Sequence, residues 1–108
     1  MHAGHKAIAI TCDHLARISA SAGLFGAAAA YCQQSILILQ KLFDPISAEM
    51  VREQIKLAKL MFNAGVAEFP KAHIRRAVTR ALQGILKTNF SVDDSERAEL
   101  ERMSQLLT

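Results

Sequence analysis

Two stretches of the chain that lie 42 residues apart carry the same pattern. Residues 15–23 read LARISASAG and residues 57–65 read LAKLMFNAG. Leucine, two alanines and glycine coincide, while Arg17 corresponds to Lys59. Similarity at a period of 20 to 50 residues is typical of helical repeats, whose units bury their apolar faces only by stacking on their neighbours. The repeat therefore predicts stacked helical hairpins.

The composition supports an all-α fold in a single domain. The chain has 108 residues, of which 51% are hydrophobic and 21% charged, the balance of a globular protein. It contains only two prolines and five glycines, and no segment alternates convincingly between polar and apolar residues. Long alanine-rich segments favour helices over strands.

Glycine and proline divide the chain into helices. Gly23 and Gly65 each follow an apolar helical pattern, where glycine accepts the left-handed backbone of a helix end. Asp44-Pro45 interrupts the chain, and Ser47 is a suitable N-cap. The expected helices run over residues 6–22, 26–43, 48–64, 70–88 and 93–107.

These helices predict one domain of two hairpins, 6–43 and 47–88, followed by a C-terminal helix, 93–107. In each copy of the repeat a leucine (Leu15 or Leu57) would pack against the second helix of its hairpin, and the alanine after it would let helices approach closely. The apolar stripes at helical spacing give the other expected core positions: Ile8, Cys12, Ala22, Ile36, Leu39, Phe43, Val51, Ile55, Phe62, Met61, Ile74, Ala77, Val78, Ala81, Ile85, Leu86, Leu100, Met103, Leu106 and Leu107.

Several other classes of protein are disfavoured. A formal charge of +3 is weak for a dedicated nucleic-acid-binding protein. The uncharged segment 18–40 is as long as a membrane span, but Gly23 and Gly26 interrupt it. Cys12 and Cys32 form no paired framework, which favours reduced, buried thiols in an intracellular protein without a signal peptide.

The repeat resembles a known motif. The pattern Leu15-Ala16, Gly23, Ala28 and Ser35 looks like a tetratricopeptide repeat (TPR), with a spacing similar to that of its long-helix variety. The stretch from Ser35 to Gly65 is similar to the C-terminal TPR-like region of the SET and MYND domain-containing lysine methyltransferases, especially their member-four branch.

This resemblance implies a TPR-like α-α superhelix that is a fragment of a larger cytoplasmic or nuclear enzyme. The catalytic SET domain and the zinc-binding MYND domain would lie elsewhere, with S-adenosylmethionine and zinc. No catalytic, cofactor-binding or metal-binding residue is expected in this chain. The spacing of His2 and His5 suits a metal, but no carboxylate lies near them in the sequence.

The TPR template also implies a peptide-binding groove. TPR arrays bind extended peptides along the first helix of each repeat, and one stripe of each such helix would face the peptide. The resulting basic strip could hold the carboxylates of an acidic peptide or of a chaperone-like tail. The expected groove residues are His14, Arg17, Ser21, Lys56, Lys59 and Asn63.

A second basic cluster lies on the fourth expected helix. It could contact phosphates or an acidic neighbouring domain such as the SET or MYND domain, but no aromatic residues alternate with it, which disfavours single-stranded nucleic acid. The patch comprises Lys71, His73, Arg75, Arg76 and Arg80.

The leading hypothesis is thus a protein-interaction domain of a SET/MYND-type lysine methyltransferase, which binds a peptide or chaperone partner and shapes the substrate cleft. One alternative is a stand-alone helical adaptor or dimerisation domain without enzymatic activity. Another is a small membrane-associated protein built on the uncharged segment 18–40.

Overall fold

Five α-helices form the fold in a computed structural model, which describes residues 3–41, 48–88 and 94–107. The helices are α1 (Ala3–Ser21), α2 (Phe25–Leu39), α3 (Ala48–Ala64), α4 (Lys71–Thr88) and α5 (Asp94–Leu106). Within these described ranges there is no strand, so the all-α prediction is confirmed.

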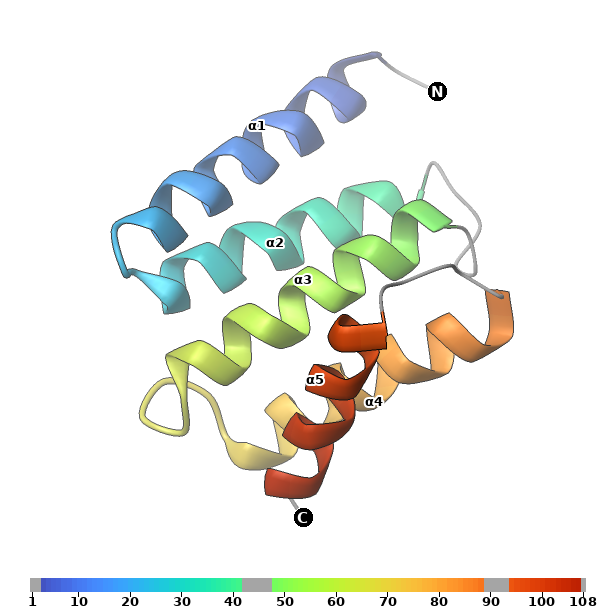
Figure 1. The fold of residues 1–108 in the computed structure, drawn as a ribbon. Helices are drawn as coiled ribbons and strands as arrows, with labels where there is room; N and C mark the ends of the chain where they lie inside the picture. Colours follow the sequence, from blue (N-terminus) through green and yellow to red (C-terminus); the bar gives the residue numbers. More distant parts are fainter. Residues whose placement is uncertain (1–2, 42–47, 89–93, 108) are drawn as a thin grey trace.

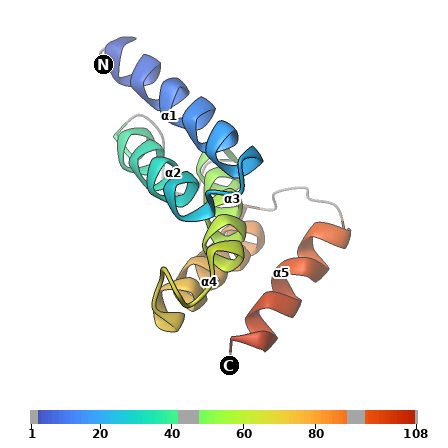
Figure 2. The ribbon, with the colours of Figure 1, turned by 90° about the vertical axis from the view of Figure 1, so that its left-hand side faces the viewer.

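The helices stack in chain order. α1 and α2 form one antiparallel hairpin, α3 packs on α2, and α4 forms a second hairpin with α3 (Figure 1). α5 packs against α4, and the view in Figure 2 shows it on the opposite side of the stack from α1. This is the expected arrangement of two hairpins and a C-terminal helix, consistent with a TPR-like stack.

Both hairpin turns depend on glycine in the left-handed region. Gly23 has a φ of +80° and Gly65 a φ of +81°. After α1 the Gly23 amide donates to the Ala20 carbonyl and the Leu24 amide to the Ser19 carbonyl, which is the Schellman arrangement. After α3 the Gly65 amide donates to the Met61 carbonyl, the simpler one-bond form. The predicted turn glycines are therefore confirmed.

Small residues allow the central helices to approach one another closely. Ala28, Ala29, Ala58 and Ala81 have no exposed surface. Larger side chains of α3, α4 and α5 surround Ala29, Ala58 and Ala81 in one cluster. The second copy of the repeat lies deeper than the first, because Met61 is buried whereas its counterpart Ser19 is only half-buried.

The first copy differs from the prediction in which face it buries. Leu15 was expected to pack on α2, yet it is exposed, and so is Ile8. α1 instead contacts α2 through small residues, Ala9, Cys12 and Ala16. The reason is that α2 presents its own alanines there, so the helices come too close for a leucine to fit between them.

Four further expectations were wrong, the first being Ala22, which was expected in the core but is exposed. The second helix ends at Leu39 rather than Phe43, because the Lys41 amide donates to the Ile38 carbonyl in a tightened last turn. Leu86 and Leu106 are exposed rather than buried. Leu86 is adjacent to the buried Ile85, and Leu106 is adjacent to the buried Leu107. Adjacent residues of a helix point in directions about 100° apart, so only one residue of each pair faces the core.

Other expectations fall partly or wholly outside the described residues. The N-cap Ser47, Phe43 and His2 lie outside them. None of the helices in the described part of the chain combines the length and the apolar character that a membrane crossing requires.

Both cysteines are free and buried. Burial is the main cause that raises the pKa of the Cys32 thiol from 9.0 to about 12, with the negative charge of Glu53 acting in the same direction. The Cys32 sulfur donates to the backbone carbonyl of Glu53 at 3.6 Å, so the thiol serves packing between α2 and α3.

This burial predicts a specific loss of stability at alkaline pH. Because the thiol ionises near pH 9.0 when unfolded but near 12 when folded, the unfolded state loses a proton first. Stability should therefore fall as pH rises between these values, by up to about 1.4 kcal/mol per pH unit. Urea unfolding should show this slope in the natural chain relative to Cys32→Ala; parallel pH profiles would contradict the assignment.

Candidate functional site

The predicted peptide strip is only partly assembled in space. Arg17, Lys56 and Lys59 line one hollow of about 210 Å³ between α1 and α3. His14 and Ser21 are exposed and do not line it. Asn63 lies one turn beyond Lys59, in the last turn of α3, and lines a separate depression beside the first hairpin turn. The helical period therefore brings together three of the six residues.

Acidic side chains lie between these cations. Asp13, one turn before Arg17, pairs with the Arg17 guanidinium at 3.1 Å and also with the Lys56 ammonium. Lys56 pairs in addition with Glu53 at 2.8 Å, and Glu53 accepts a hydrogen bond from the Ser35 hydroxyl of α2. One carboxylate from α1 and one from α3 thus hold Lys56.

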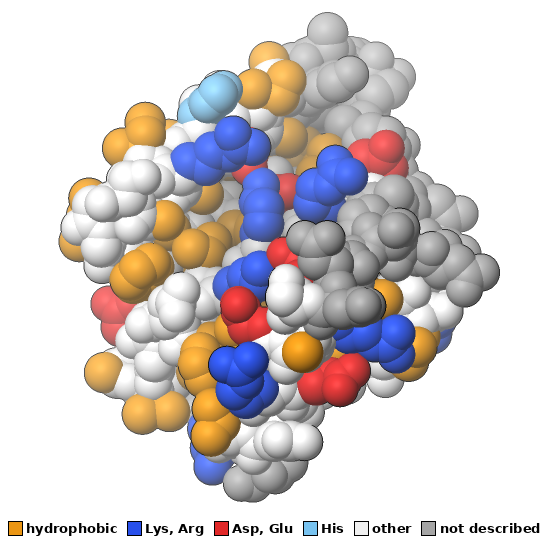
Figure 3. Space-filling model, in the orientation of Figure 1, with side chains coloured by type: hydrophobic (Ala, Val, Ile, Leu, Met, Phe, Trp, Pro, Cys, Tyr) orange, Lys and Arg blue, Asp and Glu red, His pale blue; other side chains and the backbone are white. Residues whose placement is uncertain are grey.

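Lys59 extends this pairing to the last helix. Its ammonium lies 2.7 Å from a Glu96 oxygen and 3.8 Å from a Glu99 oxygen, both on α5. We call the resulting network the charged seam: Asp13, Arg17, Glu53, Lys56, Lys59, Glu96 and Glu99. In Figure 3, blue and red side chains lie interspersed down the middle of this face.

The charged seam is close to neutral, with three cations against four carboxylates. Burial lowers the pKa of Lys56, but its hydrogen bonds to Asp13 and Glu53, together with their charges, outweigh this and raise the pKa above its usual value. An acidic ligand at Lys56 or Lys59 would have to displace a carboxylate of the chain itself.

Removal of the Lys56 ammonium should destabilise the fold. Glu53 is almost completely buried, so Lys56→Met leaves its charge without a cation beside it. We expect a loss of about 1–3 kcal/mol in the free energy of unfolding, measured with urea. Arg17→Met is the matched control, because the Arg17 side chain is 70% exposed and its pair should contribute less than about 1 kcal/mol. Equal losses in both variants would show that Lys56 has no special role.

The residues of the predicted basic patch on α4 do not share one surface. The Arg75 guanidinium donates to the backbone carbonyl of Leu107 at 2.6 and 3.1 Å, so it satisfies the C-terminal end of α5. Lys71 is exposed in the first turn of α4. Arg76 and Arg80 instead line a hollow together with His73, on the side of α4 that meets α2 and α3.

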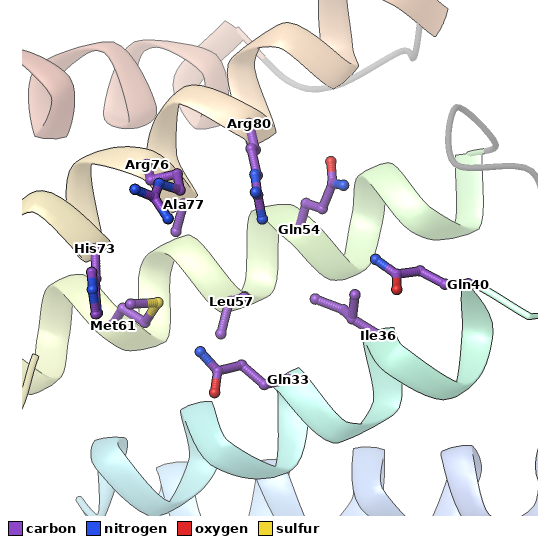
Figure 4. Close-up of a pocket in the computed structure, with 10 residues that line it drawn as sticks. All are labelled: Gln33, Ile36, Gln40, Gln54, Leu57, Met61, His73, Arg76, Ala77 and Arg80. Atoms are coloured by element: carbon purple, nitrogen blue, oxygen red, sulfur yellow. The ribbon is translucent and has the colours of Figure 1, made fainter.

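We call this hollow the arginine groove. It measures about 220 Å³, and α2, α3 and α4 all contribute to it (Figure 4). Its lining residues are Gln33 and Ile36 from α2 and the C-cap Gln40, Gln54, Leu57 and Met61 from α3, and His73, Arg76, Ala77 and Arg80 from α4. No acidic residue is among them, which distinguishes this surface from the charged seam.

Sequence reasoning missed the three glutamines and the carboxylate partners. The pairs Asp13–Arg17 and Glu53–Lys56 could have been read from their spacing on one helix. The pairs of Lys59 with Glu96 and Glu99 could not be read in this way, because the partners lie on different helices. Among the described residues, no group of three or more histidine, cysteine or acidic side chains could hold a metal ion.

The amino-acid sequence of the chain is similar to that of a known enzyme in two species. The chain is 30% identical over 95 residues to protein-lysine N-methyltransferase SMYD4 of Gallus gallus and 29% identical over 105 residues to SMYD4 of Homo sapiens. These alignments cover 88% and 97% of the chain but only 12% of each relative. The similarity confirms the resemblance to SET and MYND domain-containing lysine methyltransferases.

No protein-family profile matches the chain. No solved structure matches it either.

Proposed function

We propose that this chain is a helical interaction module of a SET/MYND-type protein-lysine methyltransferase, because nearly its whole length is similar to a stretch of SMYD4. The module binds a protein partner and leaves the chemistry to the rest of the enzyme. The observation that supports binding is an open groove with basic and amide side chains, formed by three helices.

A second part of the proposal concerns the substrate cleft. The charged seam connects α1, α3 and α5 through ion pairs, so it keeps one face of the module in a defined shape. We infer that this face borders the cleft of the methyltransferase. A face that is already close to neutral can lie against another domain without leaving charges unpaired.

The reading frame around this segment tests the proposal directly. A SET domain and a cysteine-rich zinc-binding segment in the same polypeptide are the expected result. In that polypeptide, substitutions in the arginine groove should weaken partner binding more than they change methyl transfer to a short peptide. A reading frame without either domain would overturn the proposal.

One observation favours the alternative of a stand-alone adaptor or dimerisation domain. α1 exposes Ile8, Leu15 and Ile18 along one side, with exposures of 52%, 37% and 66%. A second copy of the chain could cover this stripe. Light scattering decides between the two: a dimer that Ile18→Glu converts to a monomer would favour the alternative, and a monomeric natural chain would oppose it.

A further inference from the structure

The residues of the arginine groove lie in three parallel rows of equal length. They occupy positions 33 and 36 on α2 with its C-cap at 40, positions 54, 57 and 61 on α3, and positions 73, 76, 77 and 80 on α4. Each row spans seven residues, or about 10.5 Å along its helix. An extended polypeptide advances about 3.3 Å per residue, so the groove is as long as about three extended residues.

No carboxylate of the described residues neutralises the charge of the groove. Arg76 and Arg80 form no ion pair with an acidic side chain anywhere in the described ranges, and no carboxylate lines the groove. This contrasts with Lys56 and Lys59, which pair with carboxylates of the chain. Two guanidiniums that face the same hollow without partners favour an anionic ligand.

We propose that the arginine groove binds an extended acidic segment of a partner protein, with two carboxylates at alternate positions. Arg76 and Arg80 are one turn apart, which is about 6 Å along the helix axis. In an extended chain, residues i and i+2 are about 6.6 Å apart and point to the same side. The two guanidiniums therefore match the pattern acidic-X-acidic better than two adjacent acidic residues.

The other groups of the groove suit a peptide. Gln33 of α2 and Gln40, the C-cap of this helix, extend toward α3 in Figure 4, and Gln54 of α3 also lines the hollow. An amide side chain both donates and accepts, so it can bond the main-chain carbonyl and amide groups of an extended segment. Leu57 and Met61 provide apolar surface on α3 for the aliphatic part of the ligand.

Nucleic acid is the less suitable occupant. The groove contains no Phe, Tyr or Trp side chain, the large rings on which bases stack in most single-strand sites, and His73 is its only imidazole. A short groove with two arginines also neutralises few phosphates, whereas a protein that binds nucleic acid usually contacts many. The acidic peptide thus deepens the proposed function and rests on it, since it names the class of partner that the module binds.

An NMR titration of the labelled chain with capped peptides tests the inference. The probe contains Ser-Glu-Ala-Glu-Ser, and the largest shift changes should fall on the groove residues of α2 and α4. Arg76→Gln with Arg80→Gln should weaken binding about tenfold, because two charge-assisted hydrogen-bonding groups are lost. Lys71→Gln with Lys87→Gln removes the same charge from the same helix outside the groove, and we expect it to change affinity less than about twofold.

Two further probes separate the possible outcomes. The peptide Ser-Glu-Glu-Ala-Ser has the same composition and should bind more weakly; equal binding of the two peptides would overturn the spacing argument. An oligothymidine that binds more tightly than the first peptide, and is lost in the groove variant, would assign the site to nucleic acid instead. If the groove and control variants change the peptide affinity equally, the arginine groove is not the binding site. This outcome is independent of the reading frame, which tests the methyltransferase assignment separately.

Discussion

Leu100→Ala should lower the free energy of unfolding by about 2–5 kcal/mol, the range of buried leucine truncations that leave a cavity. Leu100 has no exposed surface and joins the cluster that contains Ile74 and Val78 of α4. It is one of two buried apolar residues of α5, the other being Met103, and the buried Leu107 follows directly after the helix. A cavity at Leu100 therefore removes much of the contact that attaches α5 to the hairpins.

The matched control for this prediction lies on the same helix. Leu106 is 65% exposed, and Leu106→Ala makes the same chemical change with the same effect on helix propensity. Its effect should stay within about 0.5 kcal/mol. Urea unfolding followed by circular dichroism measures both variants, and limited proteolysis shows whether α5 separates first. Similar losses for both leucines would mean that α5 does not pack as described.

Ala58→Leu should be the second severe change. Ala58 is the small position of the second repeat copy, and it has no exposed surface between α3 and its neighbours. Three added carbon atoms cannot fit without displacing helices, and overpacking of this kind costs about 1–3 kcal/mol or more. The thermal midpoint should fall by several degrees, since about 1 kcal/mol corresponds to 4–8 °C in a domain of this size.

An exposed alanine on the neighbouring helix provides the comparison. Ala30 lies on the exposed side of α2, so Ala30→Leu adds the same atoms in water. Helix propensity differs little between alanine and leucine, and the midpoint should hardly change. If Ala58→Leu proved as stable as Ala30→Leu, close helix packing at the repeat's small position would be disproved.

The sequence predicts the outline of the fold well because its signals are local. Gly23 and Gly65 occupy the left-handed positions that the repeat indicated, and Ala16 and Ala58 are buried at the small positions. The exposed Leu15 shows where the same reasoning fails. An apolar stripe at helical spacing predicts that one face of a helix is buried. Helix α1 has two apolar faces, and only its contact with α2 determines which of them is buried.

The candidate site could be predicted only in part. The spacing of Lys56 and Lys59 on one helix indicated correctly that both line one hollow with Arg17. The partners of Lys59 could not be predicted, because they come from α5, 37 and 40 residues further along the chain. In the arginine groove, the glutamines carry no signal at all until α2, α3 and α4 lie side by side.

The sequence by itself determined the helices, their turns and the alanines that let them pack, because each depends on backbone propensity or on residues within a few positions. Only the packing of the helices sets which face of each helix is buried. It also sets which of the described basic side chains pair with a carboxylate. Both depend on how each helix is rotated about its axis against its neighbours. That rotation pairs Lys59 with α5 and leaves Arg76 and Arg80 facing an open groove.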